Sequence, residues 1–138
     1  MHPRPMITVH DVVATSRWYQ AVLGLTSGHG GDEYEMLMDG DRLVLQLHHW
    51  DVHEHPWLGD PNLRPYGNGV ALWFQTDAID DAWARATAAG AKVAEPLAVN
   101  PLAHHREFWI VDPEGYVVVV SGPYGDVGEA TPPDGAAT

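Results

Sequence analysis

The sequence contains no cysteine. A disulfide framework, a thiolate nucleophile and a cysteine-ligated zinc or iron–sulfur site are therefore excluded. Basic residues are also scarce: seven Lys and Arg stand against nineteen Asp and Glu, for a formal net charge of -12. Because binding to nucleic acid or to an anionic membrane surface needs a basic face, neither partner is expected.

Long apolar runs are missing as well. No segment approaches the length of a membrane span, and residues 1–5 lack the apolar core of a signal peptide. We therefore expect a cytoplasmic protein. The 138 residues, 45% of them apolar, suit one globular domain, which we place at residues 1–124. Residues 125–138 are rich in Gly, Pro, Ala and acidic residues, and we expect them to form a flexible acidic tail.

The first half of the chain alternates between strand and helix patterns. Residues 5–10 have the period of a strand, and Asp11 then provides a cap for a helix that ends at Gly24. Residues 25–50 predict three short strands, with a tight hairpin turn at Asp39-Gly40. In the last of these strands Leu43, Leu45 and Leu47 share one face, which we assign to the core.

The same order of elements recurs about 67 residues later, so the chain has an internal repeat. Residues 70–75 predict a strand, and Asp77 is the expected cap of a helix that Gly90 ends. Strands follow at 92–95, 106–111 and 116–121, and residues 112–115 form the turn between the last two. Module one spans about 4–50, a connecting loop spans 51–68 and module two spans 69–124. The fold class is therefore α+β, with two βαβββ modules forming a curved mixed sheet around a concave groove.

Strand alternation predicts which side chains line this groove. One helix covers only one face of each module, so the other face must be covered by a ligand or by a second subunit. The expected ligand-binding residues are Gln46, His48, Trp50, Trp73, Gln75, Glu107, Trp109, Val119 and Ser121. A flat aromatic ligand would stack on the tryptophans, and Glu107 could receive an ammonium group. The alternative is that Trp73 and Trp109 only fill the core of a dimer.

A histidine cluster offers a different chemistry. Residues 48–55 hold four His and two acidic residues, which could form an atypical metal site. However, His48 and His49 face opposite sides of a strand, and His53 and His55 fall in the loop before Pro56. We therefore expect no metal and no cofactor. His104 and His105 are expected on a loop surface, and no serine or cysteine nucleophile has a base at a fixed spacing.

The βαβββ duplication resembles the vicinal oxygen chelate superfamily, which includes glyoxalases, extradiol dioxygenases and antibiotic-binding resistance proteins. The matching motifs are Asp11-Val12, Trp18-Tyr19, Leu23-Gly24-Leu25 and the 112–115 turn. The resemblance implies that the usual metal-ligand positions fall at Arg4, Ala71 and Val119, with Gln46 at a further position. Arginine, alanine and valine supply no ligand atom, so a metalloenzyme of the usual superfamily type is not expected.

The chain instead resembles the metal-free, bleomycin-resistance branch of the superfamily. Three features carry this second resemblance. They are residues 5–8 with the following Asp11, Trp73 within a predicted strand, and Arg106-Glu107-Phe108 before the 112–115 turn. The resemblance implies a homodimer with ligand grooves at or near the subunit interface. It also implies resistance through sequestration of a large aromatic or cationic DNA-damaging antibiotic, bleomycin-type or enediyne-type, without chemical change. The alternative is a metal-dependent glyoxalase- or dioxygenase-like enzyme that uses the histidine cluster. Pairing of the modules within one chain or between two chains stays open.

Overall fold

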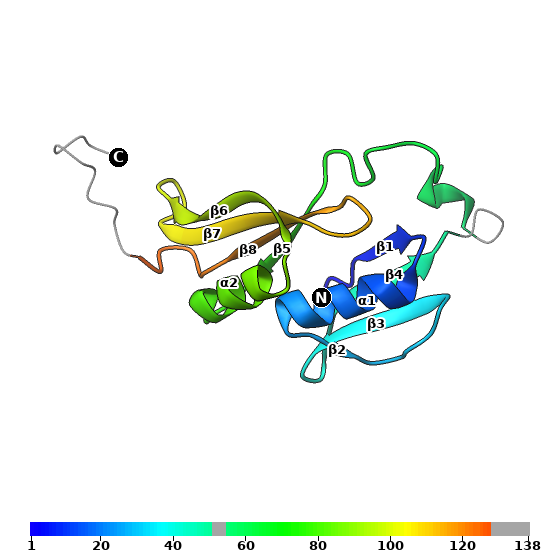
Figure 1. Cartoon of the computed structure of the whole chain (residues 1–138), viewed down its shortest axis with the longest axis horizontal. Coiled ribbons are helices and arrows are strands. Elements are labelled where there is room, and N and C mark those ends of the chain that lie inside the picture. Colours follow the sequence, from blue (N-terminus) through cyan, green and yellow to red (C-terminus); the bar gives the residue numbers. More distant parts are fainter. Residues whose placement is uncertain (51–54, 128–138) are drawn as a thin grey trace.

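A computed structural model describes residues 1–50 and 55–127. Module one comprises β1 (Met6–Val9), α1 (Val12–Leu23), β2 (Thr26–Ser27), β3 (Tyr34–Asp39) and β4 (Arg42–His49). A short 3-10 helix, η1 (Pro56–Leu58), lies in the connection. Module two comprises β5 (Ala71–Gln75), α2 (Ile79–Ala88), β6 (Lys92–Asn100), β7 (His105–Val111) and β8 (Val117–Ser121). The α+β class and the two βαβββ modules are confirmed (Figure 1).

The strands form two four-stranded mixed sheets with the same topology. Sheet A has the order β1-β4-β3-β2, and sheet B has the order β5-β8-β7-β6. In each sheet the first strand pairs in parallel with the last strand of its module, and the other pairings are antiparallel. Within the described parts of the chain, β1 and β5 therefore each keep one edge that no strand pairs with.

The two helices begin for different reasons. The Asp11 side chain accepts a hydrogen bond from the Ala14 N–H at 2.9 Å, so the predicted cap of α1 is confirmed. The predicted cap of α2 at Asp77 is wrong, because Ala78 holds the cap position and the Thr76 hydroxyl accepts from its N–H at 3.1 Å. Of the helices in residues 1–50 and 55–127, none is long and apolar enough to cross a membrane.

The helices cover one face of each sheet and contact each other between the modules (Figure 1). The core contains Leu45, Leu47, Phe108, Ile110 and Val118, all without exposed surface, as the strand alternation predicted. Leu43 departs from this prediction: it is only partly buried, because the start of β4 runs along a cleft between the modules.

Two segments of module two differ from the sequence prediction. Strand β6 is nine residues long, because two irregularities in its pairing with β7 let it continue past Pro96. Residues 125–127 form a turn whose Gly125 and Val127 N–H groups donate to the backbone carbonyls of Ala103 and His104. The remainder of the expected acidic tail, 128–138, lies outside the described residues.

The turn between β7 and β8 ties module two to module one. The Asp112 carboxylate accepts a hydrogen bond of 2.6 Å from the Tyr19 hydroxyl of α1, and both residues are buried. The same carboxylate accepts the N–H groups of Glu114 and Tyr116 at 2.9 Å, which fixes the turn. The Tyr116 hydroxyl then donates to the Thr8 carbonyl of β1 at 2.8 Å. One buried carboxylate thus sets both the shape and the docking of the turn.

Replacing Tyr19 with Phe should destabilise the fold by about 1–3 kcal/mol, because a buried carboxylate oxygen loses its hydrogen-bond donor. Urea unfolding measures the change. Tyr124→Phe is the matched control, since Tyr124 is 75% exposed and its variant should stay within about 0.5 kcal/mol of wild type. Equal stability of Tyr19→Phe and wild type would show that the contact does not hold the modules together.

Candidate functional site

Two tryptophans contact each other on the face of sheet B that is opposite α2. Trp73 on β5 and Trp109 on β7 both flank Val119 of β8 in the sheet register. Their rings meet edge to face, with centroids 6.0 Å apart. The Trp73 indole N–H donates to the Ser121 hydroxyl at 2.8 Å, yet the residue remains 47% exposed. We call the face formed by Trp73, Glu107, Trp109, Val119 and Ser121 the indole face.

Glu107 is the centre of a hydrogen-bond network on the indole face. Its Oε2 accepts the indole N–H of Trp109. Its Oε1 accepts from the Asn100 amide at 2.6 Å and contacts Nε2 of His105 at 3.0 Å. Asn100 and His105 were not predicted for the site, and His105 is buried in β7 rather than lying on a loop surface. Glu107 therefore holds Trp109 in place, and a ligand ammonium would have to compete with these donors.

The network also favours the charged form of Glu107. Burial raises the pKa of this carboxyl, but the hydrogen bonds from Trp109, Asn100 and His105 outweigh burial. Its pKa is consequently below the usual value for glutamate. The indole face thus presents aromatic surface above a carboxylate that stays ionised at neutral pH.

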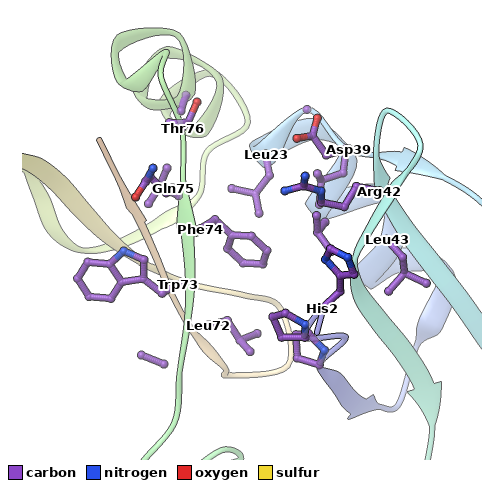
Figure 2. A pocket seen from close by; sticks show the side chains of 18 of the residues that line it. His2, Leu23, Asp39, Arg42, Leu43, Leu72, Trp73, Phe74, Gln75 and Thr76 are labelled. Atoms are coloured by element: carbon purple, nitrogen blue, oxygen red, sulfur yellow. The ribbon is translucent and has the colours of Figure 1, made fainter. Parts of the chain in front are cut away.

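The remaining sheet B residues of the predicted site differ in their access. Val119 has no exposed surface and Ser121 is 1% exposed, because the two indoles flank Val119 and Trp73 bonds to Ser121. A ligand that touched either residue would first have to displace an indole ring. Gln75 lies on the same side of β5 as Trp73 and is exposed (Figure 2).

The other predicted residues lie in module one. Gln46 accepts the Tyr34 hydroxyl at 2.5 Å and donates to the Arg4 carbonyl at 2.9 Å. Trp50 belongs to a separate group of tilted rings, with its ring centroid 5.2 Å from that of Tyr66 and 6.2 Å from that of His10. Among residues 1–50 and 55–127, no hydrogen bond or ring contact links Gln46, His48 or Trp50 to the indole face. One chain therefore does not bring all the predicted residues into one site.

The histidine cluster is partly described. The rings of His48 and His55 meet edge to face, with their centroids 4.6 Å apart. Nδ1 of His48 donates a hydrogen bond of 2.6 Å to the His49 carbonyl. Asp51, His53 and Glu54 lie outside the described residues. Where the structure describes the chain, it contains no group of three or more His, Asp or Glu side chains placed to hold a metal ion.

The positions that usually ligate metal in the superfamily do not suit a cation. Arg4 is an exposed guanidinium and Ala71 an exposed methyl group at the start of β5. Val119 is a buried valine between two indoles. Three of the four positions thus lack any ligand atom, and Gln46 alone supplies an amide. The residues present do not fit a metal of the usual kind.

A cleft of about 830 Å³ runs between the modules, along the unpaired edge of β5. Figure 2 shows Leu72 and Phe74 pointing from β5 towards Leu23 and Arg42 of module one. Trp73 and Gln75 also border the cleft, but their side chains project from the opposite side of the strand. The cleft and the indole face are therefore two sites that share one strand. Sequence periodicity did not predict the cleft, because it arises only when the modules dock.

Comparison with known proteins defines the family. The profile of the Glyoxalase/Bleomycin resistance protein/Dioxygenase superfamily matches residues 3–120. The chain therefore belongs to this superfamily, which confirms the resemblance stated from the sequence motifs. No curated protein matches the sequence significantly.

Solved structures share the fold at low sequence identity. A protein of unknown function from Agrobacterium tumefaciens is 20% identical with a TM-score of 0.71, covering 88% of this chain and 93% of its own. A glyoxalase/bleomycin resistance protein/dioxygenase family enzyme from Burkholderia phytofirmans is 23% identical with a TM-score of 0.69, covering 86% and 95%. TioX from Micromonospora sp. ML1 is 19% identical with a TM-score of 0.65, covering 90% and 98%.

Replacing Glu107 with Gln should remove a pH-dependent part of the stability. Because the folded-state pKa is lowered, the carboxylate stabilises the fold above the ordinary glutamate pKa of about 4.3 and loses this effect as the pH falls through its folded pKa. Urea unfolding should show Glu107→Gln to be less stable than wild type by about 1–3 kcal/mol at neutral pH, with a smaller difference at about pH 3.5.

The control for this measurement is Glu33→Gln, a change at an exposed residue just before β3 in module one. It should match wild type at both pH values. A difference for Glu107→Gln that is the same at both pH values would mean that the shape of the side chain, and not its charge, supports the network.

Proposed function

We propose that this protein binds an aromatic antibiotic and confers resistance by sequestering the drug without changing it chemically. The observation that carries the proposal is the half-exposed indole of Trp73. This ring donates a hydrogen bond to Ser121 and packs edge to face against Trp109, so its orientation is fixed. An aromatic surface that is both exposed and fixed loses little conformational entropy when a flat ligand stacks on it. A large, partly planar natural product of the bleomycin or enediyne type suits this surface.

The absence of usual metal ligands supports binding over catalysis. Superfamily enzymes need an open metal that polarises substrate oxygens, and Arg4, Ala71 and Val119 supply no ligand atom for it. Sequestration needs only tight binding in the cytoplasm, where a drug stacked on Trp73 cannot reach DNA. Stoichiometric protection at about 10 nM drug corresponds to a binding free energy of about -11 kcal/mol.

The proposal includes a homodimer. Apolar side chains stay exposed on strands of both sheets, including Met6 at 36%, Trp73 at 47% and Val99 at 48%. A second copy would cover such surface and would bring the Gln46 and His48 side chains of one subunit towards the indole face of the other. Each groove would then lie at the subunit interface.

Native mass spectrometry of the untagged chain with bleomycin, and separately with an enediyne chromophore, tests this function. We expect a dimer that takes up about two drug molecules of unchanged mass. Trp73→Ala and Trp109→Ala should each weaken binding by about 2 kcal/mol, roughly 30-fold, while the dimer persists. Trp57→Ala is the matched control, because Trp57 is 97% exposed on η1 and makes no ring contact with the indole face.

Three outcomes would overturn parts of the proposal. A drug that returns with altered mass would establish an enzyme. Dissociation of the dimer in the Trp73 or Trp109 variant would show that the indoles fill a subunit interface. Unchanged drug affinity in both variants would place the ligand elsewhere.

A further inference from the structure

The cleft between the modules concentrates positive charge in an otherwise acidic protein. Arg42 and Arg85 both line it, and they are two of only seven basic residues in the chain. Asp39 lines the same cleft, yet neither guanidinium forms an ion pair or hydrogen bond with it or with any other residue among 1–50 and 55–127. Arg106, by contrast, is partly buried and has Asp80 as a bidentate partner. The two cleft arginines are thus available to an external anion.

Arg85 lines this cleft from α2 and packs against the end of α1. Its Nε is buried and has no hydrogen-bond partner. A Cβ at Gly24 would lie 3.2 Å from this Nε, so the guanidinium packs directly on Gly24, the residue that ends α1 at φ +69. Arg85 itself sits in the last turn of α2. The carbonyl ends of two helices therefore flank the cation, which explains how an unpaired charge is tolerated there.

The rest of the cleft is apolar or presents backbone groups. Leu23, Leu43 and Phe74 also line it, and Figure 2 shows Phe74 pointing from β5 towards Leu23 and Arg42. The edge of β5 that faces it pairs with no strand, so its backbone N–H and carbonyl groups are also available. A ligand that suits these walls has an apolar body and an acidic head, because a carboxylate, sulfonate or phosphate pairs with guanidinium while apolar side chains bury the body.

We propose that the cleft is a second binding site, for a small amphipathic anion whose acidic head pairs with Arg85 and Arg42. Trp73 also borders the cleft, but its side chain projects from the other side of β5, where the indole face lies (Figure 2). It does not depend on the proposed sequestration. Occupation would connect α1 and β4 of module one with β5 and α2 of module two, and would therefore also stabilise the docking of the modules.

The probe is 8-anilino-1-naphthalenesulfonate, a fluorescent sulfonate with an apolar aromatic body. Arg85→Gln and Arg42→Gln should each raise its dissociation constant about tenfold, because each removes a charge-assisted hydrogen bond. Arg17→Gln is the matched control: Arg17 is exposed on α1, does not line the cleft, and its variant should bind like wild type. The uncharged analogue N-phenyl-1-naphthylamine should bind the wild type about tenfold more weakly than the sulfonate does.

The urea unfolding midpoint of each variant shows whether it is folded. Because Arg42 is exposed, Arg42→Gln should stay folded and test the site even if Arg85→Gln unfolds. Equal affinity of the sulfonate for wild type, Arg42→Gln and Arg85→Gln would overturn the proposal. Equal affinity for the sulfonate and its uncharged analogue would do the same. Loss of sulfonate binding in Trp73→Ala, with both arginine variants unaffected, would place the probe on the indole face and leave the proposed function intact.

Discussion

The hydrogen bond between Tyr19 and Asp112 is the constraint on which the other features depend. It joins a helix of module one to a turn of module two with both groups buried. Burial raises the pKa of Asp112, and the hydrogen bonds from Tyr19 and the turn backbone lower it by less. A buried carboxylate of this kind is costly unless donors surround it, so the turn must adopt one shape and one position. This contact, the Tyr116–Thr8 hydrogen bond and the packing of α1 against α2 join the two modules, and the cleft beside β5 lies between them.

A second buried carboxylate organises module one in the same way. Glu35 on β3 accepts the hydroxyls of Ser16 and Ser27 at 2.9 and 2.7 Å. It also accepts the backbone N–H groups of His29 and Gly30 at 3.1 and 2.8 Å. Burial raises its pKa, but these donors outweigh burial and the pKa is lowered. Glu35 in module one and both Asp112 and Glu107 in module two thus each have three or more donors. Of these carboxylates, Glu107 positions the aromatic surface.

The two candidate sites differ in chemistry because they lie on opposite sides of β5. Alternation along a strand sends Trp73 and Gln75 to one side and Leu72 and Phe74 to the other (Figure 2). The first side combines indoles with an ionised glutamate, which suits a neutral or cationic aromatic ligand. The second combines aliphatic walls with two unpaired arginines, which suits an anion. The two sides of one short strand therefore present different chemistry, although Trp73 borders both.

The sequence by itself determined the α+β class, the repeat, the Asp11 cap and most of the core, because these follow from local periodicity and capping. It also placed Trp73, Glu107 and Trp109 on one face, since residues on paired strands obey the same alternation. Only the tertiary structure decided that Asn100 and His105 both contact Oε1 of Glu107, and that Val119 between the two indoles has no exposed surface. The sequence also could not predict that two unpaired arginines line one cleft. Arg42 and Arg85 are 43 positions apart in the sequence, and nothing local to either residue shows that docking of the two modules places both in one cleft.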